Sequence, residues 1–177
     1  MASINGVEVK NLKRFVGHEG ECEQGNVYLN GKKLGFWSQD SWGGPDMFEF
    51  DESALDKACS DFKAGFPDSY KYKEFCDSKD VFIGYVTELK NIESYLKKDY
   101  KKGFKTTVLV TDGYHMTWMS FIKDLSEEEL FEKYQSDIEK LKDKMFENAT
   151  PRVKVFKPGM FDVVIDKEHP AEDFYLH

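Results

Sequence analysis

The sequence of 177 residues predicts an α+β fold, a largely antiparallel sheet of β-hairpins packed against two or three amphipathic helices. Two dipeptides predict the hairpins, because Asn30-Gly31 and Asp112-Gly113 each separate apolar segments and suit type I′ turns. The helices are predicted by apolar residues that recur at helical spacing after Ser78 and after Ser126. Strands, helices, a hairpin, a helix and final strands thus follow one another, which is the order of an α+β domain.

Residues 7–16 are expected to form the first strand, and a hairpin follows it. A two-residue turn at Asn30-Gly31 places Val27 opposite Leu34. Because side chains alternate across a strand, one face of this hairpin is expected in the core and the other outside it. The expected inward side chains are Val27, Leu29, Leu34 and Phe36, and the expected outward ones are Tyr28, Lys33 and Trp37.

The segment between the two hairpins carries mostly helical signals. A short strand over 47–50 is expected first, and a helix over 53–65 follows it. Residues 67–77 form either a loop or a short helical turn. A long helix begins at Ser78 and ends in the lysine-rich segment 97–103, where cations and a glycine favour a helix end.

The last third of the chain predicts a hairpin, a helix and two strands. The two-residue turn at Asp112-Gly113 places Val110 opposite His115. Ser126 then opens a capping box with Glu129, and the amphipathic helix that follows ends at Thr150-Pro151. The remaining expected elements are two short strands over 152–156 and 161–165 and a polar C-terminal tail over 166–177.

Length and composition predict a single domain over residues 1–177. No apolar run reaches the roughly 18 residues of a membrane span, and the N-terminus lacks the pattern of a signal peptide. Cys22, Cys59 and Cys76 are odd in number and lack CxxC spacing, as is typical of reduced intracellular thiols. We therefore expect a cytoplasmic protein with no membrane association.

The charge distribution bears on the class of partner. The formal net charge is −8, and Arg14 and Arg152 are the only arginines. Arginine is favoured for bidentate phosphate contacts, and an acidic surface repels nucleic acid. We therefore expect no direct nucleic-acid binding and a protein partner with a basic surface. The alternative is that the acidity serves solubility alone.

The loop before the first hairpin holds the densest cluster of possible metal ligands, and the loop after the hairpin could bring Asp40 near them. The cluster consists of His18, Glu19, Glu21, Cys22 and Glu23. Carboxylate oxygens of this kind can bind a divalent cation. However, no HExxH, CxxC or EF-hand spacing is present, so the alternative is a solvated acidic turn. We expect no metal and no cofactor, and an enzyme would use His18, Glu19, Glu21 and Asp40.

Other reactive residue types lack the context of a catalytic site. His115 stands alone in a predicted strand, which favours a hydrogen-bonded, half-buried residue over a general base. No serine lies in a GxSxG motif, and Cys59 and Cys76 are expected to pack in the interior. Neither a P-loop nor a GxGxxG motif is present, which disfavours nucleotide-dependent chemistry.

Aromatic side chains on the hairpins are the stronger functional signal. Tyr28, Trp37, Trp42 and Trp118 lie on hairpins or in an adjoining loop. Tyr and Trp are enriched at protein interfaces, because they bury a large area at little entropic cost. The alternative is that helices cover both faces of the hairpins.

The first fifty residues also resemble a group of known proteins. The resemblance lies in Val9-Lys-Asn-Leu-Lys-Arg-Phe15, Gly17-His-Glu-Gly-Glu21, Asn30-Gly-Lys-Lys33 and Asp40-Ser-Trp-Gly-Gly44. These segments are similar to those of short acidic proteins, without assigned functional residues, encoded by bacteriophages and mobile elements. The resemblance implies a small protein that binds and inhibits a host enzyme, such as a CRISPR effector or another defence nuclease.

The preferred hypothesis is a non-enzymatic protein-binding module that acts in the host cytoplasm. Its expected contact residues are the aromatic residues Tyr28, Trp37 and Trp42 and the acidic residues Glu19, Glu21 and Glu23. A small metal-dependent hydrolase or nuclease is one alternative, and a phage structural or assembly protein is another. The sequence leaves the oligomeric state open.

Overall fold

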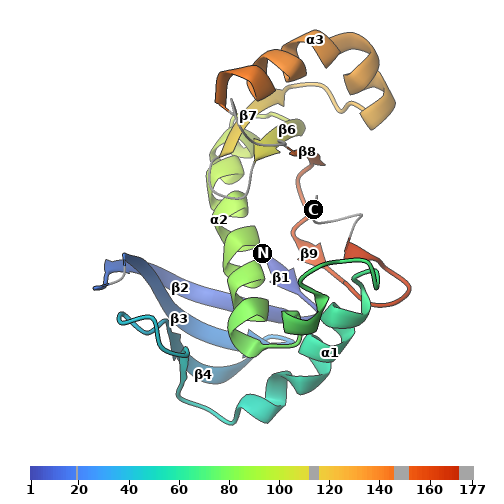
Figure 1. Cartoon of the computed structure of the whole chain (residues 1–177). Helices are drawn as coiled ribbons and strands as arrows, with labels where there is room; N and C mark the ends of the chain where they lie inside the picture. The colour runs from blue at the N-terminus through green and yellow to red at the C-terminus, as the bar shows by residue number, and fades with distance from the viewer. Residues whose placement is uncertain (19, 112–115, 146–151, 172–177) are drawn as a thin grey trace. The chain divides into compact units, whose positions relative to one another are not determined.

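The structure is a computed structural model that describes residues 1–18, 20–111, 116–145 and 152–171 (Figure 1). It is an α+β protein whose strands are paired in a dominantly antiparallel manner, as the sequence predicts. The described residues divide into two compact units, unit 1 with residues 1–93 and 161–171 and unit 2 with residues 94–160. The single domain expected over 1–177 stays a prediction. None of the described helices has both the length and the apolar composition needed to cross a membrane.

Unit 1 contains a six-stranded sheet in the order β5-β4-β3-β2-β1-β9. All neighbouring strands are antiparallel except β1 and β9, which are parallel. The strands are β1 (Ser3–Ile4), β2 (Val7–Val16), β3 (Glu21–Leu29), β4 (Lys32–Ser38), β5 (Met47–Phe48) and β9 (Asp162–Val163). The helices are the 3₁₀ helices η1 (Glu52–Leu55) and η2 (Lys73–Phe75), α1 (Asp56–Ala64), and the first part of α2 (Lys79–Lys101).

Two Asn–Gly turns set the pairing of the first three strands. The predicted turn at Asn30-Gly31 joins β3 to β4, with Leu29 opposite Lys32. A second turn, at Asn5-Gly6, joins β1 to β2 and was not predicted. Both asparagines have positive φ, 50° at Asn5 and 49° at Asn30, as a type I′ turn requires. The backbone N–H of Asn30 donates to the carbonyl of Gly6 at 2.8 Å, so the two turns lie side by side.

The register of the first hairpin differs from the prediction one residue beyond the turn. A bulge between Lys33 and Gly35 leaves Val27 opposite Gly35 instead of Leu34. An extra residue in one strand exchanges the two faces for every residue after it. Trp37, expected outside, is therefore fully buried, and Phe36, expected in the core, is only half-buried. The predicted orientation of both side chains is wrong.

One face of this sheet is covered by helices, and Figure 1 shows the first half of α2 passing over β2 and β3. The side-chain amide of Asn91 on α2 donates to Glu23 on β3 at 3.0 Å, which fixes this contact. Phe62 of α1 lies 5.2 Å, centroid to centroid, from Phe82 of α2, so the two helices also pack together. The buried apolar side chains on these elements include Val7, Val9, Val27, Trp37, Phe62, Phe82, Ile83, Val86 and Leu89.

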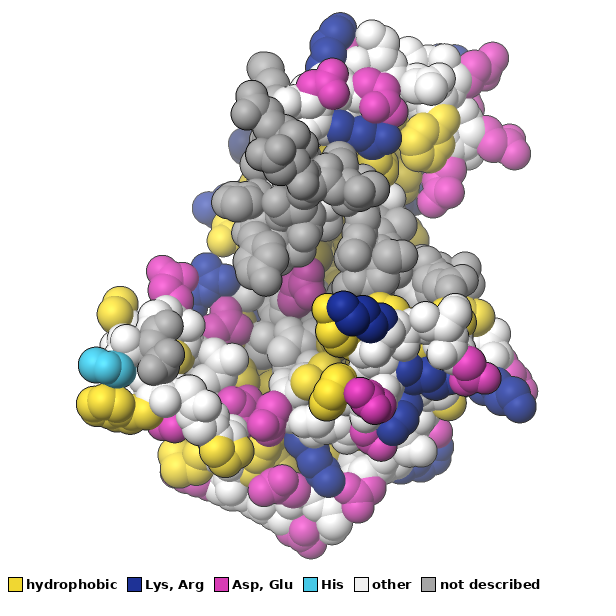
Figure 2. Space-filling model, viewed as in Figure 1, with side chains coloured by type: hydrophobic (Ala, Val, Ile, Leu, Met, Phe, Trp, Pro, Cys, Tyr) yellow, Lys and Arg dark blue, Asp and Glu magenta, His cyan; other side chains and the backbone are white. Residues whose placement is uncertain are grey.

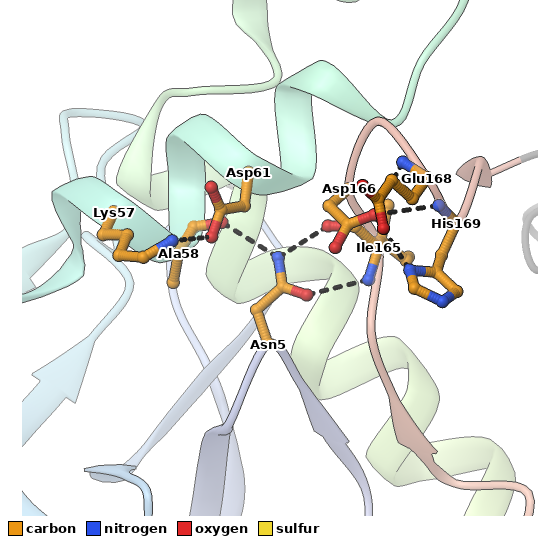
Figure 3. Close-up of polar contacts among 8 residues, drawn as sticks. All are labelled: Asn5, Lys57, Ala58, Asp61, Ile165, Asp166, Glu168 and His169. Carbon is orange, nitrogen blue, oxygen red and sulfur yellow. Dashed lines mark hydrogen bonds and ion pairs between the residues drawn. The ribbon is translucent and has the colours of Figure 1, made fainter.

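The turn at Asn5-Gly6 also ties α1 to the segment after β9 (Figure 3). The side-chain amide of Asn5 donates to the carbonyls of Ala58 at 3.1 Å and Ile165 at 2.8 Å. Its oxygen accepts from the backbone N–H of Ile165 at 2.8 Å. The tail expected over 166–177 begins with a turn in which Asp166 accepts bonds from Glu168 and His169. Residues 172–177 lie outside the described part of the chain.

Unit 2 contains a three-stranded antiparallel sheet in the order β7-β6-β8. Its elements are β6 (Thr106–Thr111), β7 (Met116–Phe121), α3 (Glu127–Met145) and β8 (Arg152–Phe156), preceded by the last two turns of α2. Its core contains Val108, Leu125, Leu130, Ile138 and Val155. The predicted capping box is confirmed, because Ser126 and Glu129 exchange hydrogen bonds of 2.9 and 3.1 Å.

The strand pairs of the second hairpin are shifted by two residues from the prediction. Val110 lies opposite Thr117 and not opposite His115, because four residues separate β6 from β7. A shift of two residues keeps each side chain on its expected face, so the predicted faces are correct while the predicted pairs are wrong. The turn at 112–113, His115 and the expected helix end at 150–151 lie outside the described residues.

Candidate functional site

The two loops that the sequence singled out lie together in unit 1. The backbone N–H of His18, in the loop between β2 and β3, donates to the carbonyl of Ser41, in the loop between β4 and β5, at 2.8 Å. The close approach depends on Gly17, since a Cβ there would lie 2.8 Å from the Cβ of Ser41. The tips of two adjacent hairpins therefore form one continuous surface.

An exposed aromatic pair stands on this surface. The rings of His18 and Trp42 are stacked, with centroids 4.3 Å apart and planes 20° from parallel. Trp42 remains 67% exposed, and Val16, two residues before His18, is 85% exposed. Figure 2 shows a surface histidine (cyan) with hydrophobic side chains directly beside it. We call Val16, His18, Glu21 and Trp42 the tip surface; Glu21 is exposed opposite Val16 in the β2–β3 pair.

The three acidic residues expected on this surface have different environments. Glu21 is exposed at the start of β3. Glu23 is only 15% exposed, because it forms an ion pair with Arg14 at 2.9 Å and accepts a bond from Asn91. A carboxylate held in this way belongs to the packing of α2 on the sheet and not to an open acidic surface. Glu19 lies outside the described residues.

The other two expected aromatic contacts are less available than Trp42. Trp37 is buried, and its indole N–H donates to the Asp46 carboxylate at 2.7 Å. Tyr28 is half-buried on the sheet face opposite the helices, where the Lys10 ammonium lies 4.3 Å from its ring centroid. Trp118, in unit 2, donates from its indole N–H to Asp99 at 3.0 Å and packs against Tyr95. Only Trp42 of these four presents most of its ring to solvent.

The carboxylates near the tip surface are committed to structural contacts. Asp40 accepts a bond from the backbone N–H of Gly44 at 2.7 Å, which closes the loop between β4 and β5. Burial raises the pKa of Asp46, and the nearby Asp80 adds to this effect, although the bond from Trp37 lowers it. Within the described ranges, no three His, Cys, Asp or Glu side chains gather in a group that could hold a metal ion. The described residues therefore provide no geometric support for the metal-dependent hydrolase or nuclease.

The cysteines behave as packing residues. Cys22, Cys59 and Cys76 are all buried and free. Burial raises the pKa of the Cys59 thiol to about 12 and raises that of Cys76. Since the thiolate is the reactive form, neither group is prepared for nucleophilic chemistry. This agrees with the interior position expected for Cys59 and Cys76.

Sequence reasoning missed Val16 as part of the exposed surface. Its strand, β2, contains a bulge between Lys10 and Lys13. After this bulge the side chains of Arg14 and Val16 lie on the helix side of the sheet, where Val16 is nevertheless 85% exposed. An apolar residue directly before a Gly-His-Glu-Gly loop is the only signal of its position in the sequence.

Comparisons of the chain with models of protein families, with curated proteins and with solved structures gave no match.

Proposed function

We propose that the protein is a non-enzymatic binding module that docks on a protein partner through the tip surface. The observation that carries this proposal is the exposure of Trp42, which is stacked on His18 and held on a two-loop platform. A large, rigid aromatic side chain of this kind is a typical anchor of a protein interface. Val16, two residues before His18, adds exposed apolar area, so docking would remove both side chains from water.

The partner that fits this surface is a protein with a basic site. The chain carries a net charge of −8, and Glu21 is an exposed acidic residue of the tip surface. Complementary charge would steer association, while Trp42 would supply affinity and slow dissociation. Together with the resemblance to phage-encoded proteins, this supports a cytoplasmic host enzyme that handles nucleic acid, whose basic site the module would occupy.

The proposal is tested by affinity capture from a bacterial lysate, followed by binding measurements on the partner that is identified. We expect Trp42→Ala to weaken binding by about 2 kcal/mol, or roughly 30-fold. Glu21→Lys is expected to slow association and to reduce its dependence on salt. The captured enzyme should lose activity in proportion to the wild-type protein added.

A matched control is Tyr72→Ala, which removes another aromatic side chain of unit 1 that is 53% exposed. This variant is expected to bind as the wild type does. If Trp42→Ala and Glu21→Lys also bind as the wild type does, the tip surface is not the docking site and the proposal fails. A partner that binds without loss of its activity would contradict the inhibitory role.

A further inference from the structure

A groove of about 480 Å³ lies on the six-stranded sheet, at the bulge in β2. Its lining comes from three adjacent strands and consists of Asn11, Leu12, Lys13, Gln24, Gly25, Asn26 and Phe36. The register brings the side chains together, since Asn26 lies opposite Phe36 on β4, and Gln24 lies opposite Lys13 on β2. This volume is in the range of small-molecule sites.

The groove is on the sheet face that the helices leave uncovered. Val9 and Val27 form a cross-strand pair that is fully buried on the helix side. The next pair, Lys10 and Asn26, points to the opposite face because side chains alternate along each strand. Gln24 and Phe36 share that face with Asn26. The groove is thus separate from the tip surface and from the core.

The residues of the β2 bulge form one side of the groove. Asn11, within the bulge, has a φ of 54°, so the chain leaves the regular path of the strand there. Gly25 on β3 accommodates this path, because a Cβ at Gly25 would lie 2.6 Å from Val9 and 3.1 Å from the carbonyl of Lys10. The bulge thus brings Asn11 and Leu12 to the groove, while Gly25 allows β2 and β3 to stay close together on the helix side.

The polar groups of the groove have unused hydrogen-bonding capacity. The side-chain amides of Asn11, Gln24 and Asn26 form no hydrogen bond with the described part of the chain, and Lys13 forms no ion pair with it. Each amide offers a donor and an acceptor side by side, while Lys13 offers a positive charge. No carboxylate lines the groove, and the half-buried Phe36 ring provides an apolar surface.

We propose that this groove binds a nucleoside monophosphate. Side-chain amides pair with the hydrogen-bonding edges of bases, and for Asn and Gln the best match is adenine. A phenyl ring supports a base by stacking, and a lysine ammonium binds a phosphate as a point charge. The three kinds of group that such a ligand needs are all present within one groove.

The net charge of −8 decides between a free nucleotide and a nucleic-acid strand. A strand brings one negative charge per nucleotide against an acidic protein, so long-range repulsion opposes it. A mononucleotide brings only its own phosphate, which Lys13 faces. We therefore assign the free nucleotide as the ligand.

The test is isothermal titration calorimetry of the full chain. The protein is titrated separately with AMP, adenosine, ribose 5-phosphate and an oligo(dA) of about ten nucleotides. We expect saturable binding of AMP, and binding at least about tenfold weaker for adenosine and ribose 5-phosphate, because each lacks one of the recognised groups. Lys13→Glu and Asn26→Asp are expected to weaken AMP binding by at least about tenfold. Phe36→Ala should weaken it as well, provided that its circular dichroism spectrum matches the wild type.

The matched control is Lys33→Glu, which reverses an exposed lysine on the same strand as Phe36 but outside the groove. This variant and Trp42→Ala are expected to bind AMP as the wild type does. The proposal is overturned if AMP does not bind, if Lys13→Glu and Asn26→Asp bind AMP unchanged, or if ribose 5-phosphate binds as well as AMP. Tighter binding of oligo(dA) than of AMP would overturn the assignment of a free nucleotide.

Discussion

Trp37 and Trp42 lie five residues apart, yet the structure treats them in opposite ways. Trp37 is 0% exposed, lies among the side chains under the helices, and donates to Asp46. Trp42 is 67% exposed, and its ring is stacked on the ring of His18. The same side chain therefore contributes to folding at one position and is available for binding at the other.

The difference between them is decided by the backbone and not by hydrophobicity. The bulge between Lys33 and Gly35 turns Trp37 toward the helices, and a regular strand would have turned it away. Beyond Ser38 the chain leaves the sheet, so no opposite strand determines where Trp42 points. The register of the strands must therefore be known before the exposure of these tryptophans can be used to predict a binding site.

The largest effect is expected for removal of Trp37. Trp37→Ala should lower the free energy of unfolding by about 3–5 kcal/mol, because it leaves a cavity and removes the donor to Asp46. Trp42→Ala should change it by less than about 0.5 kcal/mol, since an exposed side chain is removed. Urea unfolding of both variants and of the wild type measures these changes in the free energy of unfolding, provided that the m-values are equal. Equal losses of stability would show that the contrast between the two sites is wrong.

The two Asn–Gly turns offer the same contrast for a polar residue. Asn5 makes three side-chain hydrogen bonds, whereas the exposed side chain of Asn30 makes none with described residues. Alanine would be strained to a similar extent at both positions, because both have φ near 50°. Asn5→Ala should therefore lower the free energy of unfolding by about 2 kcal/mol more than Asn30→Ala does, because it leaves backbone groups of Ala58 and Ile165 without partners.

Thermal or urea unfolding of the two alanine variants gives this difference directly. The strain of alanine at positive φ contributes equally to both variants, so the difference between them measures the hydrogen bonds of Asn5. A difference near zero would mean that these bonds are replaced by water at no cost, and that the contact between the turn, α1 and the segment after β9 is weaker than its geometry indicates.

The smallest effect is a pH dependence at the buried tryptophan. Burial raises the pKa of Asp46 above its usual 3.8, so the folded protein holds this proton more tightly than the unfolded chain does. As the pH falls from the pKa of the folded state toward 3.8, Asp46 therefore makes the free energy of unfolding larger. The stability of the wild type relative to Asp46→Asn should therefore increase between pH 7 and pH 4. A relative stability that is constant with pH, or that decreases, would contradict this assignment.

Local signals predicted much of the fold. The turn at Asn30-Gly31, the capping box of Ser126 and Glu129, and the long helix were correct, because each depends on residues that are close in sequence. The missed strand β1 had a similar signal in Asn5-Gly6, but two residues make a strand only when β2 and β9 pair with it. The candidate site was predicted less well, since Trp37 was misplaced and Val16 was missed.

The sequence by itself determined the element types, the α+β class and the two loops rich in glycine and acidic residues. These follow from turn chemistry, helical periodicity and capping, which act over a few residues. Only the tertiary structure decided which aromatic side chains are buried, that the two loops meet at Gly17 and Ser41, and that a groove opens beside Gly25. The physical reason is that bulges in β2 and β4 set the register, and a bulge is stabilised by packing across strands that the local sequence does not contain.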